Sequence, residues 1–108
     1  MANPATIGED GGVIEATTTE GSVTLDPYYR YAIWHNGRNT SGAADDDTIY
    51  FSTSAEVEAD PAAGSGRQQL VDGASAPLPL GAAILRFKTA TGAPTFSICA
   101  IDKPARFS

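Results

Sequence analysis

The sequence predicts an all-β fold, either a single antiparallel β-sandwich or a small β-barrel, with about seven to nine short strands and extended N- and C-terminal arms. No window places apolar residues at the spacing of an amphipathic helix. Short segments rich in Val, Ile, Thr, Tyr and Phe recur instead, and clusters of Gly, Pro, Asn and Asp separate them. The length of 108 residues is that of one domain.

Several segments along the chain are candidate strands. They span residues 13–19, 22–26, 28–35, 47–53, 55–59, 67–72, 76–80, 83–89 and 95–101. The ends lack strand character, so we predict an extended N-terminal arm (1–12), a sandwich domain (13–101) and a C-terminal tail (102–108). The polar segment 36–46 is longer than a tight hairpin needs, and we expect this loop to project.

The best local pattern is AILRFKTATGAPTFSICAI, residues 83–101. Leu85 and Phe87 share one face of the first run, whereas Arg86 and Lys88 share the other. The second run, TFSICAI, alternates in the same way. Because a Gly-Pro turn joins the two runs, we predict that they pair as an antiparallel hairpin.

The stretch YYRYAIWHNG, residues 28–37, concentrates four of the nine aromatic residues and the only histidine. Because successive side chains of a strand point to opposite faces, one set of side chains in this stretch is assigned to the core and the other to the outside. The core set is Tyr29, Tyr31, Ile33 and His35, with His35 expected near water at the strand end; the outward set is Tyr28, Arg30, Ala32 and Trp34.

A Tyr28–Arg30–Trp34 ladder on the outward face is the best candidate for a contact with another chain, since arginine between aromatics is common at interfaces. The alternative places Trp34 in the core and lays the stem of Arg30 along the sheet.

The charge of the chain is uneven along its length. The net charge is −6, with −9 in residues 1–60 and +3 in residues 61–108. Separate acidic and basic surfaces would draw copies together, whereas interleaved strands would mix the charges. An acidic chain repels phosphate backbones, so we expect no nucleic-acid partner.

We expect a soluble protein with no membrane partner. The first residues, MANPATIGEDGG, show neither the basic nor the apolar part of a signal peptide. The longest nearly apolar run, APLPLGAAIL, falls far short of the ~20 residues that span a bilayer.

The sequence predicts no enzyme, with no catalytic residue and no cofactor. His35 is the only histidine and Cys99 the only cysteine, and no nucleophile, zinc, phosphate-loop or dinucleotide motif is present. Asp45, Asp46 and Asp47 are the only plausible ligands for a hard cation. Because EF-hand spacing and its closing glutamate are missing, we favour a solvated acidic loop and predict no metal site.

Residues 31–101 resemble small all-β structural proteins of tailed bacteriophages. The resemblance lies in the run from IWHNG through DTIYFSTS, the Gly-Ser-Gly turn and LVDGASAPLPLGAAILRFKTATGAPTFSICAI. The resemblance assigns no functional role to any particular residue of this sequence. It implies a virion structural protein, and more specifically a capsid decoration (cement) protein that stabilises the head by bridging major capsid subunits.

The resemblance also implies where the chain works and with what. The partners would be the major capsid protein or other virion proteins and sister copies in a trimer or dimer, on the capsid surface of a virion assembled in the host cytoplasm. The arms would lie along the shell or a sister subunit, with Phe107 as an apolar peg and Arg106 as its charged companion.

Two other classes of protein remain as alternatives. The first is a tail, neck or baseplate module that contacts a receptor, with the loop 36–46 and the Tyr28/Trp34 face on a host glycan. The second is a cellular carbohydrate-binding module. The copy number per virion separates decoration from tail proteins.

Overall fold

Short strands make up the described part of the chain, which in this computed structural model comprises residues 3–8, 10–53 and 68–102. The strands are β1 (Thr6–Ile7), β2 (Gly12–Glu15), β3 (Gly21–Leu25), β4 (Arg30–His35), β5 (Ile49–Ser52), β6 (Gln68–Leu70), β7 (Ser75–Pro77), β8 (Ile84–Thr89) and β9 (Thr95–Asp102). The predicted strand 55–59 lies outside the described residues. Among the residues described, no helix is long and apolar enough to cross a membrane.

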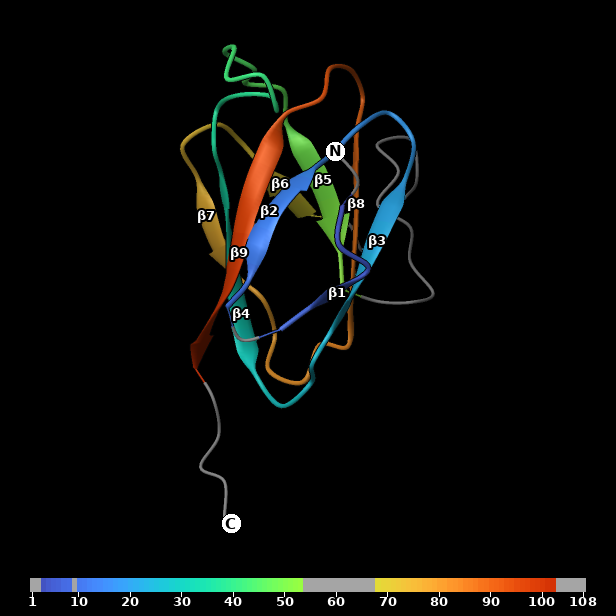
Figure 1. Cartoon of the computed structure of the whole chain (residues 1–108), viewed down its shortest axis with the longest axis vertical. Helices are drawn as coiled ribbons and strands as arrows, with labels where there is room; N and C mark the ends of the chain where they lie inside the picture. Colours follow the sequence, from blue (N-terminus) through green and yellow to red (C-terminus); the bar gives the residue numbers. More distant parts are fainter. Residues whose placement is uncertain (1–2, 9, 54–67, 103–108) are drawn as a thin grey trace.

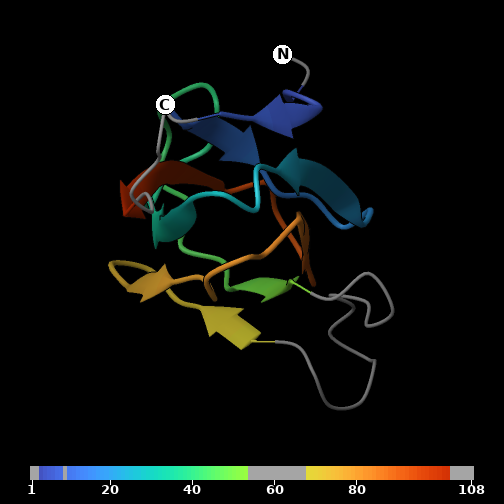
Figure 2. The same cartoon turned by 90° about the horizontal axis from the view of Figure 1, so that it is seen from below.

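The strands form two sheets that lie face to face (Figures 1 and 2). The five-stranded sheet has the order β1-β3-β8-β5-β6, and the four-stranded sheet has the order β2-β9-β4-β7. All described pairings are antiparallel except that of β1 with β3. The predicted all-β antiparallel sandwich is therefore confirmed.

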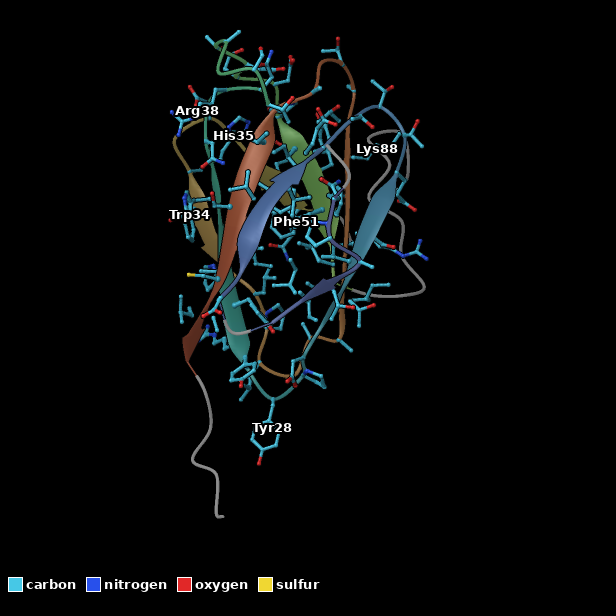
Figure 3. The ribbon with its side chains drawn as sticks, in the orientation of Figure 1. Tyr28, Trp34, His35, Arg38, Phe51 and Lys88 are labelled. Carbon is cyan, nitrogen blue, oxygen red and sulfur yellow. The ribbon has the colours of Figure 1, made fainter. Side chains whose placement is uncertain are left out.

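Alternate side chains of both sheets fill the space between them. On β4, Tyr31 and Ile33 point inward, and on β9 Phe96 and Ile98 do the same. Across the core the rings of Phe96 and Phe87, from β8, meet edge to face with their centroids 5.3 Å apart. This contact joins the two sheets directly. Phe51, from β5, is buried in the same core and is labelled among the side chains of Figure 3.

The hairpin predicted for residues 83–101 is wrong. β8 pairs with β3 and β5 in the five-stranded sheet, whereas β9 pairs with β2 and β4 in the four-stranded sheet. The turn between β8 and β9 connects the five-stranded sheet to the four-stranded sheet. Both strands keep the predicted alternation because each turns its apolar side to the same core from opposite directions.

The segment 1–12, predicted as an arm, contains β1, and Ile7 on β1 is buried in the core. The Tyr31 hydroxyl donates a hydrogen bond to the Ile7 carbonyl (3.1 Å) and accepts one from the Asp26 N–H (3.2 Å). Burial raises the pKa of Tyr31, although the hydrogen bond from Asp26 acts in the opposite direction. The tyrosine thus ties this N-terminal segment to the start of β4.

The two halves of the sequence are interleaved in space. The five-stranded sheet combines β1, β3 and β5 with β6 and β8, and the four-stranded sheet combines β2 and β4 with β7 and β9. The acidic residues 1–60 and the more basic residues 61–108 are therefore not segregated onto separate sheets. Arg67, Lys103 and Arg106, three of the five basic residues of the second half, lie outside the described residues, so the distribution of charge over the surface stays a prediction.

We predict that Phe87→Ala lowers the free energy of unfolding by about 3–5 kcal/mol, because it removes a buried ring from the contact between the sheets. Equilibrium denaturation measures the change. Tyr28→Ala, at an exposed aromatic position, is the control and should cost less than about 1 kcal/mol. Equal losses in the two variants would contradict the described core.

Candidate functional site

The outward side chains of the four-stranded sheet include the predicted contact residues of β4. Trp34 is 38% exposed, so the alternative that buries it in the core is wrong. Arg30 is half-buried, and its Nε donates to the Leu78 carbonyl (3.3 Å). Tyr28 is 46% exposed but lies in the turn before β4, at the lower tip of the molecule in Figure 3, well below Trp34. Tyr28 and Trp34 therefore do not form one ladder, and the contact role of these residues stays a prediction.

The other two predicted contact residues, Arg106 and Phe107, lie outside the described residues.

The register of the four-stranded sheet places a strip of apolar side chains on its outer surface. Trp34 is the cross-strand neighbour of Ser97, and Ala32 is that of Cys99. Ala32 and Cys99 are half-buried, and Ile101, farther along β9, is 51% exposed. We call Ala32, Trp34, Cys99 and Ile101 the outer strip. Arg30 lies at the end of the sheet where Ile101 is found.

A pocket of about 370 Å³ opens at the other end of the same outer surface. Val13 on β2 and Ser97 on β9, which are register partners, form part of its lining, and Thr95 joins them. Asn3 and Glu15 line it as well. The two hold each other, because the Asn3 side-chain amide donates to the Glu15 carbonyl and accepts from the Glu15 N–H, both at 2.8 Å.

The loop after β4 supplies the rest of the pocket lining, from Asn36, Arg38, Asn39, Thr40 and Gly42. This loop projects beyond the sheets, as predicted (Figure 1). Its base is fixed to β9: the Asn36 N–H donates to the Thr95 carbonyl (3.0 Å), and the Thr95 N–H donates to the Arg38 carbonyl (2.9 Å).

Side-chain hydrogen bonds fix the same junction. The Asn36 amide donates to the Thr95 hydroxyl (3.2 Å) and accepts from the Ser97 hydroxyl (3.1 Å). The Thr95 hydroxyl in turn donates to the Arg38 carbonyl (2.8 Å). These hydrogen bonds therefore fix the base of the loop, at Asn36 and Arg38, to Thr95 and Ser97 of β9.

His35 is buried, which corrects the prediction that it lies near water. Its Nδ1 accepts a hydrogen bond from the Gly37 N–H (2.9 Å), so the proton of the neutral ring is on Nε2, which donates to the Asp47 carbonyl (2.7 Å). The ring thus joins the two ends of the loop between β4 and β5. Both bonds join the ring to the backbone of this same loop.

The acidic run forms a second tie across the same end of the sandwich. Asp45 accepts from the Ala93 N–H (3.0 Å) through Oδ2 and from the Asp47 N–H (3.2 Å) through Oδ1. Gly92 has a positive φ of 74°, and a Cβ there would collide with the Asp47 carboxyl. The acids therefore pack against the turn between β8 and β9, which the prediction of a solvated loop did not anticipate for Asp45.

Asp45 and Asp47 also share a side-chain hydrogen bond, which separates their pKa values. That bond raises the pKa of Asp47 above 3.8, and burial adds to the increase. Burial opposes ionisation of Asp45, but hydrogen bonds from the Ala93 N–H and from Asp47 outweigh it, and the pKa of Asp45 is lowered. As the pH rises, Asp45 is therefore expected to ionise before Asp47.

The structure does not bring Cys99 and His35 together. His35 points into the core from β4, whereas Cys99 points outward from β9, so the two lie on opposite faces of one sheet. Within residues 3–8, 10–53 and 68–102, no group of three or more histidine, cysteine or acidic side chains is placed to hold a metal ion.

The comparisons with known proteins give no relative. No protein-family model, no curated protein and no solved structure matches the chain.

We predict that Asp47→Asn raises the melting temperature by a few degrees at about pH 7 and changes it little at about pH 4. Because the folded-state pKa of Asp47 is raised, its contribution to stability is fully present below its ordinary pKa of 3.8 and is lost as the pH rises through the raised value. An asparagine amide donates to Asp45 without needing that proton.

Asp46→Asn is the matched control, since it removes the same charge from the same loop at an exposed position. Thermal melts across the acidic range compare the two variants. An identical pH dependence in the native chain and in Asp47→Asn would contradict the raised pKa of Asp47.

Proposed function

We propose that the chain is a non-catalytic structural component of a tailed-phage virion, and more specifically a capsid decoration protein that bridges major capsid subunits on the head surface. The sequence resemblance of residues 31–101 to small all-β phage structural proteins supports this proposal. The sandwich is the fold class expected from that resemblance.

The observation that carries the proposal is the outer strip. Single exposed apolar residues are common, but apolar side chains that adjoin one another on one sheet face are typical of a surface that meets a partner. Trp34 is 38% exposed and Ile101 is 51% exposed, with the half-buried Ala32 and Cys99 between them in the register. Arg30 at one end adds a cation, which favours an acidic rim on the partner surface.

The edges of the four-stranded sheet favour contact through this face and not through strand addition. At one edge, the Asn3 amide occupies the Glu15 N–H and carbonyl of β2. At the other edge, β7 ends in Pro77, which has no N–H to donate. Both features make edge-to-edge pairing less favourable, which suits many copies that bind a capsid lattice without polymerising on one another.

Decoration works by multivalency. Each copy contributes a modest contact, and a copy that touches two capsid subunits, or that is joined to sister copies as a trimer or dimer, gains from high effective concentration. A small chain built around a rigid core suits this task because little order has to be imposed on binding.

The projecting loop between β4 and β5 favours a second candidate function, a tail, neck or baseplate module that contacts a receptor. A receptor-contacting protein presents such a loop away from the particle, whereas a decoration protein needs its sheet face against the shell. A cellular carbohydrate-binding module is the third candidate. It would also use the projecting loop for binding, but it would not be part of a virus particle.

The stoichiometry in purified virions tests the proposal. We predict a copy number comparable with that of the major capsid protein, measured by quantitative mass spectrometry of particles, with density over the capsid surface in electron micrographs. A handful of copies at the tail would favour the second candidate. Absence of the chain from particles would exclude both virion functions.

We predict that Trp34→Glu weakens binding to particles that lack the protein by tenfold or more, because it places a charge in the middle of the outer strip. Titration of purified variant onto such particles measures the loss. Leu80→Glu is the control, since Leu80 is 64% exposed but lies in the segment between β7 and β8, off this sheet. Equal binding of the two variants would show that another surface meets the capsid.

A further inference from the structure

The pocket beside the projecting loop has polar groups that the fold itself does not use. The carboxylate of Glu15 and the guanidinium of Arg38 make no hydrogen bond or ion pair with any described residue. Both residues line the pocket. One acceptor and one donor, each charged, are therefore available to a ligand.

Asn39 offers a third such group, and its orientation is fixed. Its Oδ1 accepts hydrogen bonds from the Ser41 N–H (3.0 Å), the Ser41 hydroxyl (2.7 Å) and the Ala43 N–H (3.1 Å). The amide nitrogen donates to none of the described residues. Because the oxygen is held by three donors, the nitrogen is presented as a preorganised donor on a loop whose base is bonded to β9.

The remaining lining completes an amphipathic surface. Val13, from β2, is 56% exposed and lines the pocket, and Thr40 lines it from the loop. Trp34 lies one strand beyond Ser97, which lines the pocket, so an aromatic ring flanks the opening on the same outer surface. Figure 3 shows Arg38 above Trp34 on this side of the molecule.

The charge balance of the pocket selects the class of ligand. A phosphate or nucleotide would meet one arginine beside a glutamate, on a chain whose net charge is −6. A divalent cation would find one carboxylate and an arginine. Neutral hydroxyl groups, in contrast, both donate to Glu15 and accept from Arg38 and Asn39, and the C–H face of a sugar ring packs on Val13 or Trp34.

We infer that this pocket binds a neutral saccharide. Glu15, Arg38 and Asn39 hold its hydroxyl groups, Val13 supports the ring, and Trp34 stacks on an adjoining sugar unit. The volume of about 370 Å³ is at the lower end of the range for small-molecule sites, about 300–1,000 Å³, as expected for the end of a glycan. This inference stands on the pocket alone and does not require the capsid assignment.

The experiment is an NMR titration of the ¹⁵N-labelled chain with four separate probes, namely glucose, galactose, mannose and N-acetylglucosamine, and with inorganic phosphate as the anion probe. We expect saturable shifts from at least one sugar at millimolar concentration. The amides that move should be those of Val13, Glu15, Ser97 and the loop segment 38–42.

Glu15→Gln and Arg38→Gln should each weaken binding of the best sugar by about tenfold, since each removes a charged hydrogen-bonding partner. Lys88→Gln is the matched control, because Lys88 lies on β8 at the opposite side of the molecule (Figure 3), and it should bind like the native chain. Unchanged melting temperatures confirm that the variants fold.

Three results would overturn the inference. One is that no probe sugar shifts the pocket amides of the native chain. Another is that Glu15→Gln and Arg38→Gln bind like Lys88→Gln. The third is that phosphate alone saturates the pocket, which would identify an anion site in place of a saccharide site. None of these results depends on the copy number in virions. If the saccharide inference fails, the proposed virion function is still tested separately by that copy number.

Discussion

The burial of alternate side chains from two sheets in one shared core is the constraint on which the rest of the molecule depends. Because Ile33 and Ile98 must face inward, Trp34 and Ser97 must face outward, and a slip of one residue would reverse both. The contact of Phe87 with Phe96 fixes the spacing of the sheets. The outward direction of the outer strip and of the pocket floor therefore follows from core packing.

Alternation predicted which side chains are inside but not which strands are neighbours. Leu85 and Phe87 on β8, like Phe96 and Ile98 on β9, are buried as the pattern indicates. The pattern is the same whether two strands lie side by side in one sheet or face each other across a core, so it favoured a hairpin where the chain changes sheets. The two arrangements differ in the strands that pair with β8 and β9. These partners include β3 for β8 and β4 for β9, and both are remote in sequence from the strands they pair with.

The candidate site was predictable only where its contacts are local. Asn39-Thr40-Ser41 bonds within its own turn, and the length of the segment 36–46 predicted a projecting loop. The pairing of Asn3 with Glu15 and of Asn36 with Thr95 spans 12 and 59 residues, and no local pattern encodes such contacts. His35 shows the same limit: its inward direction follows from period two, but its burial depends on the loop that returns over it to Asp47.

The most direct test of this account is the strand pairing measured by nuclear Overhauser effects between backbone protons in solution. We expect cross-strand effects that link Ile33 with Ile98 and Val23 with Leu85. We expect none between the backbones of β8 and β9, which meet only through side chains such as the rings of Phe87 and Phe96. A ladder of backbone effects joining β8 directly to β9 would contradict the sandwich, and with it the outward placement of Trp34 and the pocket.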